Sequence, residues 1–390
     1  MNVLDRFSDT ELAAAVLKDI SGLANRMSSR TVRLMEVCGT HTFAIMRSGI
    51  PGLLPSNIRL VSGPGCPVCV TPPGLIDLAA EISLREDTTL VTFGDMMRVP
   101  GTRRSLESAK AKGANVHVVY SPADLIPLAQ NAPDKRIVFF AVGFETTTPS
   151  ISWTLIRAGE SGLKNLFIIP ANKLIPPALD LLASDKNTNV HGFICPGHVS
   201  VIIGSAAYRP IANKYAIPCA VAGFEPLDVL LAIRMLLLQL VEERAEVEIE
   251  YSRVVTERGN ERACEIIDEV FEPADSVWRG LGIMPRSGLK LRPKYQHMDA
   301  LLSHHSCENP ALDLIGSGNS SEAQTGTFSD DSMPSGCACG EVLKGIKIPT
   351  ECAMFGTRCT PDNPIGPCII SSEGTCAAYY KYGPNPYGKP

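Results

Sequence analysis

Cysteine is the residue type whose placement in this chain most clearly points to chemistry. The sequence has 390 residues and 13 cysteines. Six cysteines lie in the last 54 residues, among glycine, proline and polar residues: Cys337, Cys339, Cys352, Cys359, Cys368 and Cys376. Thiolates supplied by loops suit a soft metal centre, either zinc or an iron–sulfur cluster. A second group of cysteines lies near the start of the chain, so two separate thiol centres favour metal or redox chemistry over packing.

Spacing in the cysteine-rich tail favours a cluster over zinc. Separations of 14, 6 and 16 residues divide a set of four: Cys337, Cys352, Cys359 and Cys376. The paired Cys-x-x-Cys knuckles typical of zinc sites are absent from the tail. Cys339 competes with Cys337 for the first ligand position, and Cys368 is spare. The tail has few large apolar residues, so we expect its structure to depend on a bound metal.

Residues 66–69 read Cys-Pro-Val-Cys. In this spacing Cys66 and Cys69 can close a disulfide reversibly or clamp a metal such as iron. The preceding Gly-Pro-Gly predicts a tight turn that exposes both sulfurs. Thr71 as N-cap and Pro72 as first helical residue predict a helix start, whose positive end lowers thiol pKa values. A zinc half-site or a buried structural pair is the alternative.

Residues 38–41 read Cys-Gly-Thr-His and directly follow a predicted strand. Ligands bind at the carboxyl ends of strands in parallel sheets. Cys38 with nearby His41 can therefore form an activated thiolate or a pair of metal ligands. A buried cysteine beside a capping histidine is the structural alternative.

Three further loops follow predicted strands and carry Asp95, Glu145 and His198. Thr148 as N-cap and Pro149 as first helical residue predict a helix start after Glu145. Each loop could serve only to cap a helix, but together they place polar side chains on the ligand-bearing edges of the sheets. Glu145 could accept hydrogen bonds from a ligand or order a thiol site.

Other cysteines and histidines are given less weight. Cys195, Cys219 and Cys264 lie in apolar or helical contexts and are predicted to be core residues. The patch at 304–307, His-His-Ser-Cys, borders a polar stretch. The glycine-rich segments form neither a phosphate loop nor a dinucleotide fingerprint.

Apolar runs rich in β-branched residues alternate with helical patterns and must position these loops. The expected strands are 31–37, 58–62, 88–93, 115–120, 136–142, 166–170, 190–195 and 217–221. The expected helices are 9–28, 72–86, 103–112, 149–159, 174–184, 198–208 and 226–243. This alternation predicts an α/β fold whose parallel sheets are covered on both faces.

We expect three parts. A first α/β domain, 30–130, contains Cys38 and the Cys-Pro-Val-Cys motif, and a second, 131–244, contains the loops of Glu145 and His198. Residues 245–390, with the helix at 9–28, form a smaller cysteine-rich domain. The polar stretch 299–336 is predicted to be a loop insertion without function.

Composition narrows the functional classes. A net charge of −5 without a basic run argues against nucleic-acid binding. We expect no signal peptide, and the apolar run 227–241 is too short for a membrane span and contains Asp228. The expected location is the cytoplasm, where thiols stay reduced, so the cysteines are expected to be ligands or reactive thiols.

The motifs occur together in a specific order. They are Met-Glu-Val-Cys-Gly-Thr-His-Thr at 35–42, Gly-Pro-Gly-Cys-Pro-Val-Cys-Val at 63–70, Phe-Gly-Asp-Met-Met-Arg-Val-Pro-Gly at 93–101, Gly-Phe-Glu-Thr-Thr at 143–147, Pro-Gly-His-Val-Ser at 196–200, Cys-Ala-Cys-Gly-Glu at 337–341 and Ser-Glu-Gly-Thr-Cys-Ala at 372–377. With this set the chain resembles, over nearly its whole length, the HypD family of nickel–iron hydrogenase maturation factors. The resemblance implies two Rossmann-like domains and a small domain with a 4Fe-4S cluster.

The resemblance also implies a role and partners. It implies a scaffold on which an iron centre acquires carbon monoxide and cyanide ligands, giving the Fe(CN)2CO unit. A small HypC-type chaperone shares the iron, a HypE-type protein donates cyanide, and the unit passes on to the hydrogenase large subunit.

Site residues follow from the same resemblance. Cys38 matches the cysteine that holds iron jointly with a chaperone cysteine, and Cys66 with Cys69 matches the redox-active or iron-associated pair. The tail set of Cys337, Cys352, Cys359 and Cys376 matches the cluster ligands. Phe43 stands where some members have a second histidine, so no ligand role is expected there.

A relay is our hypothesis for the mechanism. Low-spin iron favours thiolate donors such as Cys38. Cys66 and Cys69 can supply two electrons by closing to a disulfide, and a cluster could recharge them one electron at a time. The alternatives are a cluster-containing thiol–disulfide oxidoreductase that works alone and a zinc-binding interaction module.

Overall fold

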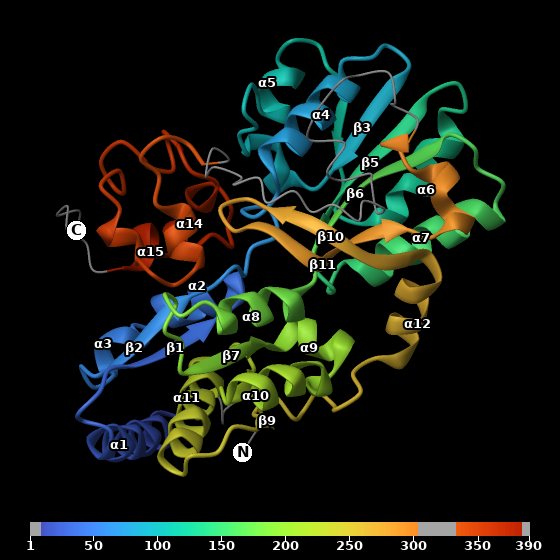
Figure 1. The fold of residues 1–390 in the computed structure, drawn as a ribbon. Coiled ribbons are helices and arrows are strands. Elements are labelled where there is room, and N and C mark those ends of the chain that lie inside the picture. Colours follow the sequence, from blue (N-terminus) through green and yellow to red (C-terminus); the bar gives the residue numbers. More distant parts are fainter. Residues whose placement is uncertain (1–8, 303–332, 384–390) are drawn as a thin grey trace. The chain divides into compact units, whose positions relative to one another are not determined.

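The computed structural model describes residues 9–302 and 333–383 (Figure 1). These residues form two compact units whose segments interleave along the chain. The first takes its described residues from Met1–Cys66, Ala178–Glu261 and Gly336–Pro390, and the second from Pro67–Pro177 and Arg262–Ser335. Each unit contains one parallel sheet.

The sheet of the first unit has five parallel strands. Their order across the sheet is β2 (Ile58–Ser62), β1 (Val32–Glu36), β7 (Gly192–Pro196), β8 (Cys219–Ala222) and β9 (Val247–Ile249). β1 and β2 run in register, with Glu36 opposite Ser62. The loops that leave the carboxyl ends of these two strands therefore start at the same level.

The first unit also contains helices. They are α1 (Thr10–Arg26), α2 (Gly39–Arg47), α3 (Ile50–Leu53), α9 (Gly197–Ile203), α10 (Arg209–Tyr215), α11 (Pro226–Val241), α14 (Cys339–Leu343) and α15 (Thr375–Tyr382). α1 lies along α11 (Figure 1). Val16, Ile20 and Ala24 recur at helical spacing on its buried face, where they join one apolar core with Leu34.

The sheet of the second unit has four parallel strands in the order β4 (Val116–Val118), β3 (Thr88–Thr92), β5 (Arg136–Gly143) and β6 (Leu166–Asn172). Its helices are α4 (Pro73–Ser83), α5 (Leu106–Lys110), α6 (Leu125–Asn131) and α7 (Thr148–Glu160); α8 (Ile175–Ser184) and α12 (Glu261–Val270) span the division between the units. β5 is buried along almost its whole length, as expected for a central parallel strand.

An antiparallel hairpin completes the second unit. β10 (Phe271–Trp278) pairs with β11 (Gly282–Leu291), and an isolated bridge between Lys173 and Gly288 joins the hairpin to the segment after β6. The hairpin contributes Phe271 and Leu291 to the apolar core of this unit. Short 3-10 helices lie at Gly94–Arg98, Pro122–Asp124, Ser205–Tyr208, Pro293–Met298, Pro349–Glu351 and Pro367–Ile369.

The α/β fold class with two parallel sheets is confirmed, but the chain is divided differently from the expected domains. β1 and β2 precede the expected boundary near residue 130, and they share a sheet with β7, β8 and β9, which follow it. The expected third domain is also divided, because residues 262–302 belong to the second unit and the cysteine-rich tail to the first. Apolar patterning marks strands, whereas tertiary packing selects their neighbours.

Two other expectations concern the polar stretch 299–336 and membrane-spanning helices. Most of the stretch 299–336, including the patch at 304–307, lies outside the described residues. Within the described ranges, no helix combines the length and the apolar character needed to cross a bilayer.

The position of β1 inside the sheet predicts that Leu34 contributes strongly to the free energy of unfolding, because its side chain is fully buried. Leu53 of the same unit is the control, since it is 56% exposed. Leu34→Ala removes buried methyl groups and leaves a cavity, so it should lower the free energy of unfolding by about 2–5 kcal/mol. Leu53→Ala should change it by less than about 0.5 kcal/mol. Urea denaturation followed by circular dichroism measures both, and equal effects would contradict this packing.

Candidate thiol and metal centres

The Cys38 loop and the start of the Cys-Pro-Val-Cys loop lie in direct backbone contact. Gly39 N donates a hydrogen bond of 3.0 Å to Gly65 O, and Gly63 N donates one of 2.6 Å to Glu36 O. A Cβ atom on Gly65 would lie 2.4 Å from Cys38 N, closer than side chains allow. Only glycine permits this approach, which holds the two thiol motifs side by side.

The side chain of Glu36 fixes the backbone position of Cys38. Its buried carboxylate accepts hydrogen bonds from Cys38 N at 2.9 Å and from Thr42 Oγ1 at 2.5 Å. Burial raises the pKa of Glu36 to about 7, against the opposing effect of these hydrogen bonds. The side chain thus joins the end of β1 to the first turn of α2.

Cys38 is the N-cap residue of α2, and its side chain is almost fully buried. Burial raises the pKa of its thiol to about 12, and the nearby carboxylates of Glu36 and Glu373 also raise it, whereas backbone groups of Thr40 and His41 lower it. The thiol is therefore protonated near neutral pH in the metal-free chain. A bound cation reverses this balance because it stabilises the thiolate directly.

His41 and His198 lie in one aromatic stack. The ring of Phe224 lies between them, with centroid distances of 4.7 Å to His41 and 3.8 Å to His198. His41 Nε2 bonds to Gly223 O at 2.9 Å, while its buried Nδ1 has no hydrogen-bond partner. Burial lowers the pKa of His41 to about 4, so the imidazole is neutral and its Nδ1 is a free acceptor. Phe224 carried no signal in the sequence analysis.

The Cys-Pro-Val-Cys motif is a closed, buried loop. Cys66 and Cys69 are both disulfide-bonded, and the other cysteines of the described ranges are free thiols, so the two are bonded to each other. The expectation that the turn exposes both sulfurs is wrong, because Cys66 is 2% exposed and Cys69 is fully buried. Apolar neighbours such as Val70 enclose them.

The expected helix caps are each shifted by one residue. α4 begins at Pro73 with Pro72 as N-cap, and Thr71 instead donates its hydroxyl to Pro67 O at 2.9 Å, which closes the disulfide loop. The N-cap of α7 is Thr147, so Thr148 is already helical. Thr148 Oγ1 donates to Phe144 O at 2.8 Å, four residues earlier. Threonines can satisfy nearby carbonyls as well as helix starts, so sequence alone does not separate the two uses.

Glu145 lies in the second unit, at the carboxyl end of β5. Its Oε1 accepts a hydrogen bond of 2.8 Å from Ile175 N, and its buried Oε2 has no partner. Burial raises the pKa of Glu145 to about 7. Lys173, which the sequence analysis did not single out, directly follows β6 and is buried, and its backbone N donates a hydrogen bond of 2.9 Å to Gly143 O. Burial lowers the pKa of Lys173 to about 7. Asp95 is exposed on the 3-10 helix Gly94–Arg98.

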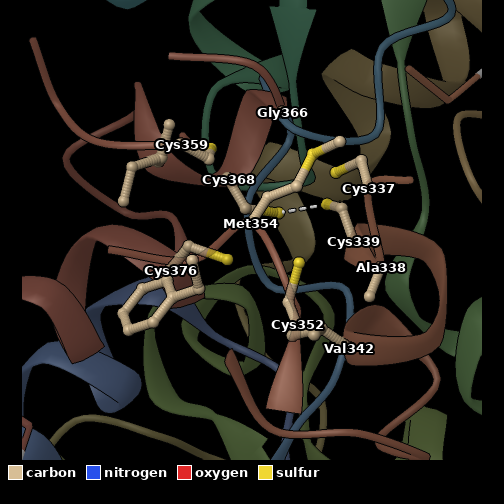
Figure 2. A pocket seen from close by; sticks show the side chains of 12 residues that line it. Cys337, Ala338, Cys339, Val342, Cys352, Met354, Cys359, Gly366, Cys368 and Cys376 are labelled. Atoms are coloured by element: carbon tan, nitrogen blue, oxygen red, sulfur yellow. Dashed lines mark hydrogen bonds between the residues drawn. The ribbon is translucent and has the colours of Figure 1, made fainter. Parts of the chain in front are cut away.

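All six tail cysteines line one cavity in the first unit. Figure 2 shows their side chains around a common space: Cys337, Cys339, Cys352, Cys359, Cys368 and Cys376. Cys339 Sγ lies 2.7 Å from Cys368 Sγ, the contact drawn as a dashed line. This contact pairs two of the six sulfurs with each other inside the shared cavity.

The donor chemistry of this cavity fits a sulfur-ligated cluster. Burial raises the pKa of Cys337 to about 12, and burial together with the surrounding thiolates raises the pKa of Cys376. Such crowding of thiols is unfavourable for the free thiolates and becomes favourable around cationic iron. Among the described residues, no three His, Cys, Asp or Glu side chains converge tightly enough to hold a single metal ion. The ligands of a cluster lie further apart because a cluster is larger than an ion.

The remaining cysteines of the described residues differ in burial. Cys195 and Cys219 are fully buried on adjacent strands, as expected for core residues. Cys264 on α12 is only partly buried, contrary to expectation. α12 is a peripheral helix with one apolar face, and helical spacing alone did not place Cys264 relative to that face.

Comparison with known proteins gives full-length matches. The family model HypD, described as "Hydrogenase formation hypA family", matches residues 11–383. The chain is 43% identical over 395 residues to the "Hydrogenase expression/formation protein HupD" of Azotobacter chroococcum, covering 98% of this chain and 97% of that protein. The "Hydrogenase maturation factor HypD" of Azotobacter vinelandii gives the same identity and coverage. That of Cupriavidus necator is 40% identical over 391 residues, with 98% and 97% covered.

Glu145 predicts a pH-dependent stability difference. Its folded pKa of about 7 exceeds the ordinary 4.5, so the folded chain binds this proton more tightly and loses stability as pH rises between those values. Glu145→Gln removes this dependence. From pH 5 to pH 8, the free energy of unfolding of the variant should rise relative to that of the natural chain by roughly 3 kcal/mol at most. Urea titrations at both pH values test this; a constant difference would show that Glu145 stays ionised when folded.

Proposed function

The chain belongs to the HypD family and takes part in hydrogenase maturation, and from this premise we propose that it is the scaffold on which the Fe(CN)2CO unit of nickel–iron hydrogenases is built. The backbone contact between Gly65 and Cys38 carries this proposal, because it joins an iron-binding thiol to a redox-active loop. In it, the iron unit is cargo. Cys38 holds this cargo together with a cysteine from a HypC-type chaperone.

Cys38 is prepared for iron by its neighbours. Glu36 and Gly65 fix its backbone, so the sulfur has little freedom to lose when iron binds. Iron binding displaces the thiol proton, since the thiolate is the ligand.

The Cys66–Cys69 pair supplies electrons in this proposal. Closing the dithiol to a disulfide breaks two S–H bonds, forms one S–S bond and releases two electrons and two protons. A cyano group carried on the sulfur of a HypE-type donor leaves as cyanide with a thiolate only when it takes up two electrons. The two half-reactions balance, and cyanide then binds the iron on Cys38.

We assign the 4Fe-4S cluster to Cys337, Cys352, Cys359 and Cys376. The contact between Cys339 and Cys368 supports this choice, because it pairs these two sulfurs with each other. When bound, the cluster supplies electrons one at a time, drawn from an external one-electron reductant. Reopening the disulfide would take two such electrons together with two protons.

A cluster-containing thiol–disulfide oxidoreductase that works alone is the second candidate. The closed Cys66–Cys69 disulfide favours it as much as it favours the scaffold. Partner dependence separates the two. A scaffold co-purifies with the small chaperone and carries iron with diatomic ligands, whereas an oxidoreductase turns over a dithiol substrate without partners.

Cluster content should depend on four tail cysteines and not on the other two. Replacing Cys337, Cys352, Cys359 or Cys376 singly by alanine should remove most of the iron, sulfide and visible absorption from anaerobically purified protein, which should otherwise hold about four iron atoms per chain. Cys339→Ala and Cys368→Ala are the matched controls and should keep them. If Cys339→Ala lost its iron and sulfide while Cys337→Ala kept them, Cys339 and not Cys337 would be the first ligand.

Iron loading should depend on Cys38 and on the disulfide pair in different ways. Cys38→Ser should abolish the infrared bands of iron-bound cyanide and carbon monoxide in the complex with the chaperone, because the iron loses a ligand. The double variant Cys66→Ala/Cys69→Ala should bind iron but lack the cyanide bands. Cys264→Ser, at a partly buried thiol outside both centres, should keep all bands. Full cyanide bands in the double variant would rule out the relay.

A further inference from the structure

The end of β10 and the turn that follows it contact three of the motif loops. At the end of β10, the ring of Trp278 stacks on Phe144 of the Gly-Phe-Glu-Thr-Thr motif, with centroids 6.0 Å apart. Trp278 Nε1 donates a hydrogen bond of 2.9 Å to Ser287 Oγ across the hairpin, which fixes the ring. The next residue, Arg279, is 2% exposed and among the largest fully enclosed side chains of the described chain.

Arg279 joins two loops that the sequence keeps apart. Its backbone N–H donates to Val70 O at 2.9 Å, and Val70 directly follows Cys69. Its guanidinium Nη1 donates to Pro100 O at 2.8 Å, at the end of the loop 93–101. One residue therefore anchors the carboxyl side of the disulfide loop to a second motif loop.

The two bonds of Arg279 have different requirements. Any residue except proline can donate the backbone bond to Val70, but only a long cationic side chain can reach Pro100 and bring a positive charge with it. Burying a guanidinium carries a desolvation cost that an apolar side chain would avoid. The guanidinium therefore has a role beyond filling space, and the backbone bond to Val70 ties the same residue to the cysteine pair.

We propose that Arg279 is a positioning residue for the Cys66–Cys69 pair, which holds the disulfide loop against the loop 93–101 and favours the reduced form of the pair. Reduction breaks the S–S bond and takes up two electrons and two protons. It also frees the loop 66–69, which Arg279 then still holds through its bonds to Val70 and Pro100. The proposal rests on the proposed function only in assigning a redox role to the pair.

The test is the reduction equilibrium of the pair in full-length, anaerobically purified protein. The protein is equilibrated with dithiothreitol at set ratios of its dithiol and cyclic disulfide forms, so that the reagent supplies both electrons and both protons. Thiols are then trapped, and the peptide containing both cysteines is quantified by mass spectrometry. Arg279→Gln should make reduction about tenfold less favourable, about 30 mV more negative. Arg279→Lys keeps the positive charge and should make reduction of the pair only about threefold less favourable.

The matched control is Arg286→Gln, which removes an exposed arginine from the same hairpin. It should leave the equilibrium unchanged. An Arg279→Gln protein with the natural equilibrium, or a shift of equal size in Arg286→Gln, would overturn the proposal.

A measurement on the natural chain covers the case in which Arg279 variants do not fold. Because Arg279 couples the loops, reducing the disulfide should change amide hydrogen exchange in 99–104 and at Arg279 itself. Unchanged exchange there would also overturn the proposal. Neither readout involves iron loading, so a tenfold shift in Arg279→Gln beside full cyanide bands in the Cys66→Ala/Cys69→Ala variant would retain the positioning role and reject the relay.

Discussion

The level pairing of β1 with β2 is the constraint on which the candidate site depends. Because Glu36 lies opposite Ser62, the chain leaves both strands at the same height, and Cys38 meets the glycine loop within a few residues. Gly65 has no side chain, so its backbone can lie against that of Cys38. Residues nearly thirty positions apart are thereby held at backbone distance by the sheet itself, without help from side-chain flexibility.

Burial sets the charge state of this region. In a medium of low polarity the Cys38 thiol keeps its proton and the His41 imidazole stays neutral. The tail cavity follows the same rule, since burial raises the pKa of Cys337 and Cys376. In both centres the metal-free thiols are therefore neutral, and a bound cation would favour their thiolate form. This behaviour supports the proposal that iron is the cargo.

Sequence patterns identified the parts of this molecule better than their assembly. Cys38 and Cys66 could be placed on one edge because both follow apolar strands, and parallel strands end together. The hairpin of Arg279 gave no such signal, since Pro273 and a central run of polar residues interrupt its strand pattern. Phe224 and Lys173 were missed because their roles come from contacts across the fold. In the tail, spacing could not choose between Cys337 and Cys339, and the contact of Cys339 with Cys368 is the observation that supports our proposal of Cys337.

The central claim is that backbone contact couples Cys38 to the adjoining disulfide loop. The rate at which Cys38 reacts with a small alkylating reagent tests this coupling most directly. Cys38 and the disulfide pair lie on different tryptic peptides, so mass spectrometry can follow Cys38 alone. The account predicts that Cys38 reacts several-fold faster or slower once the disulfide is opened, while Cys195, buried elsewhere in the same sheet, keeps its rate. A Cys38 rate that is the same in both redox states would contradict the account.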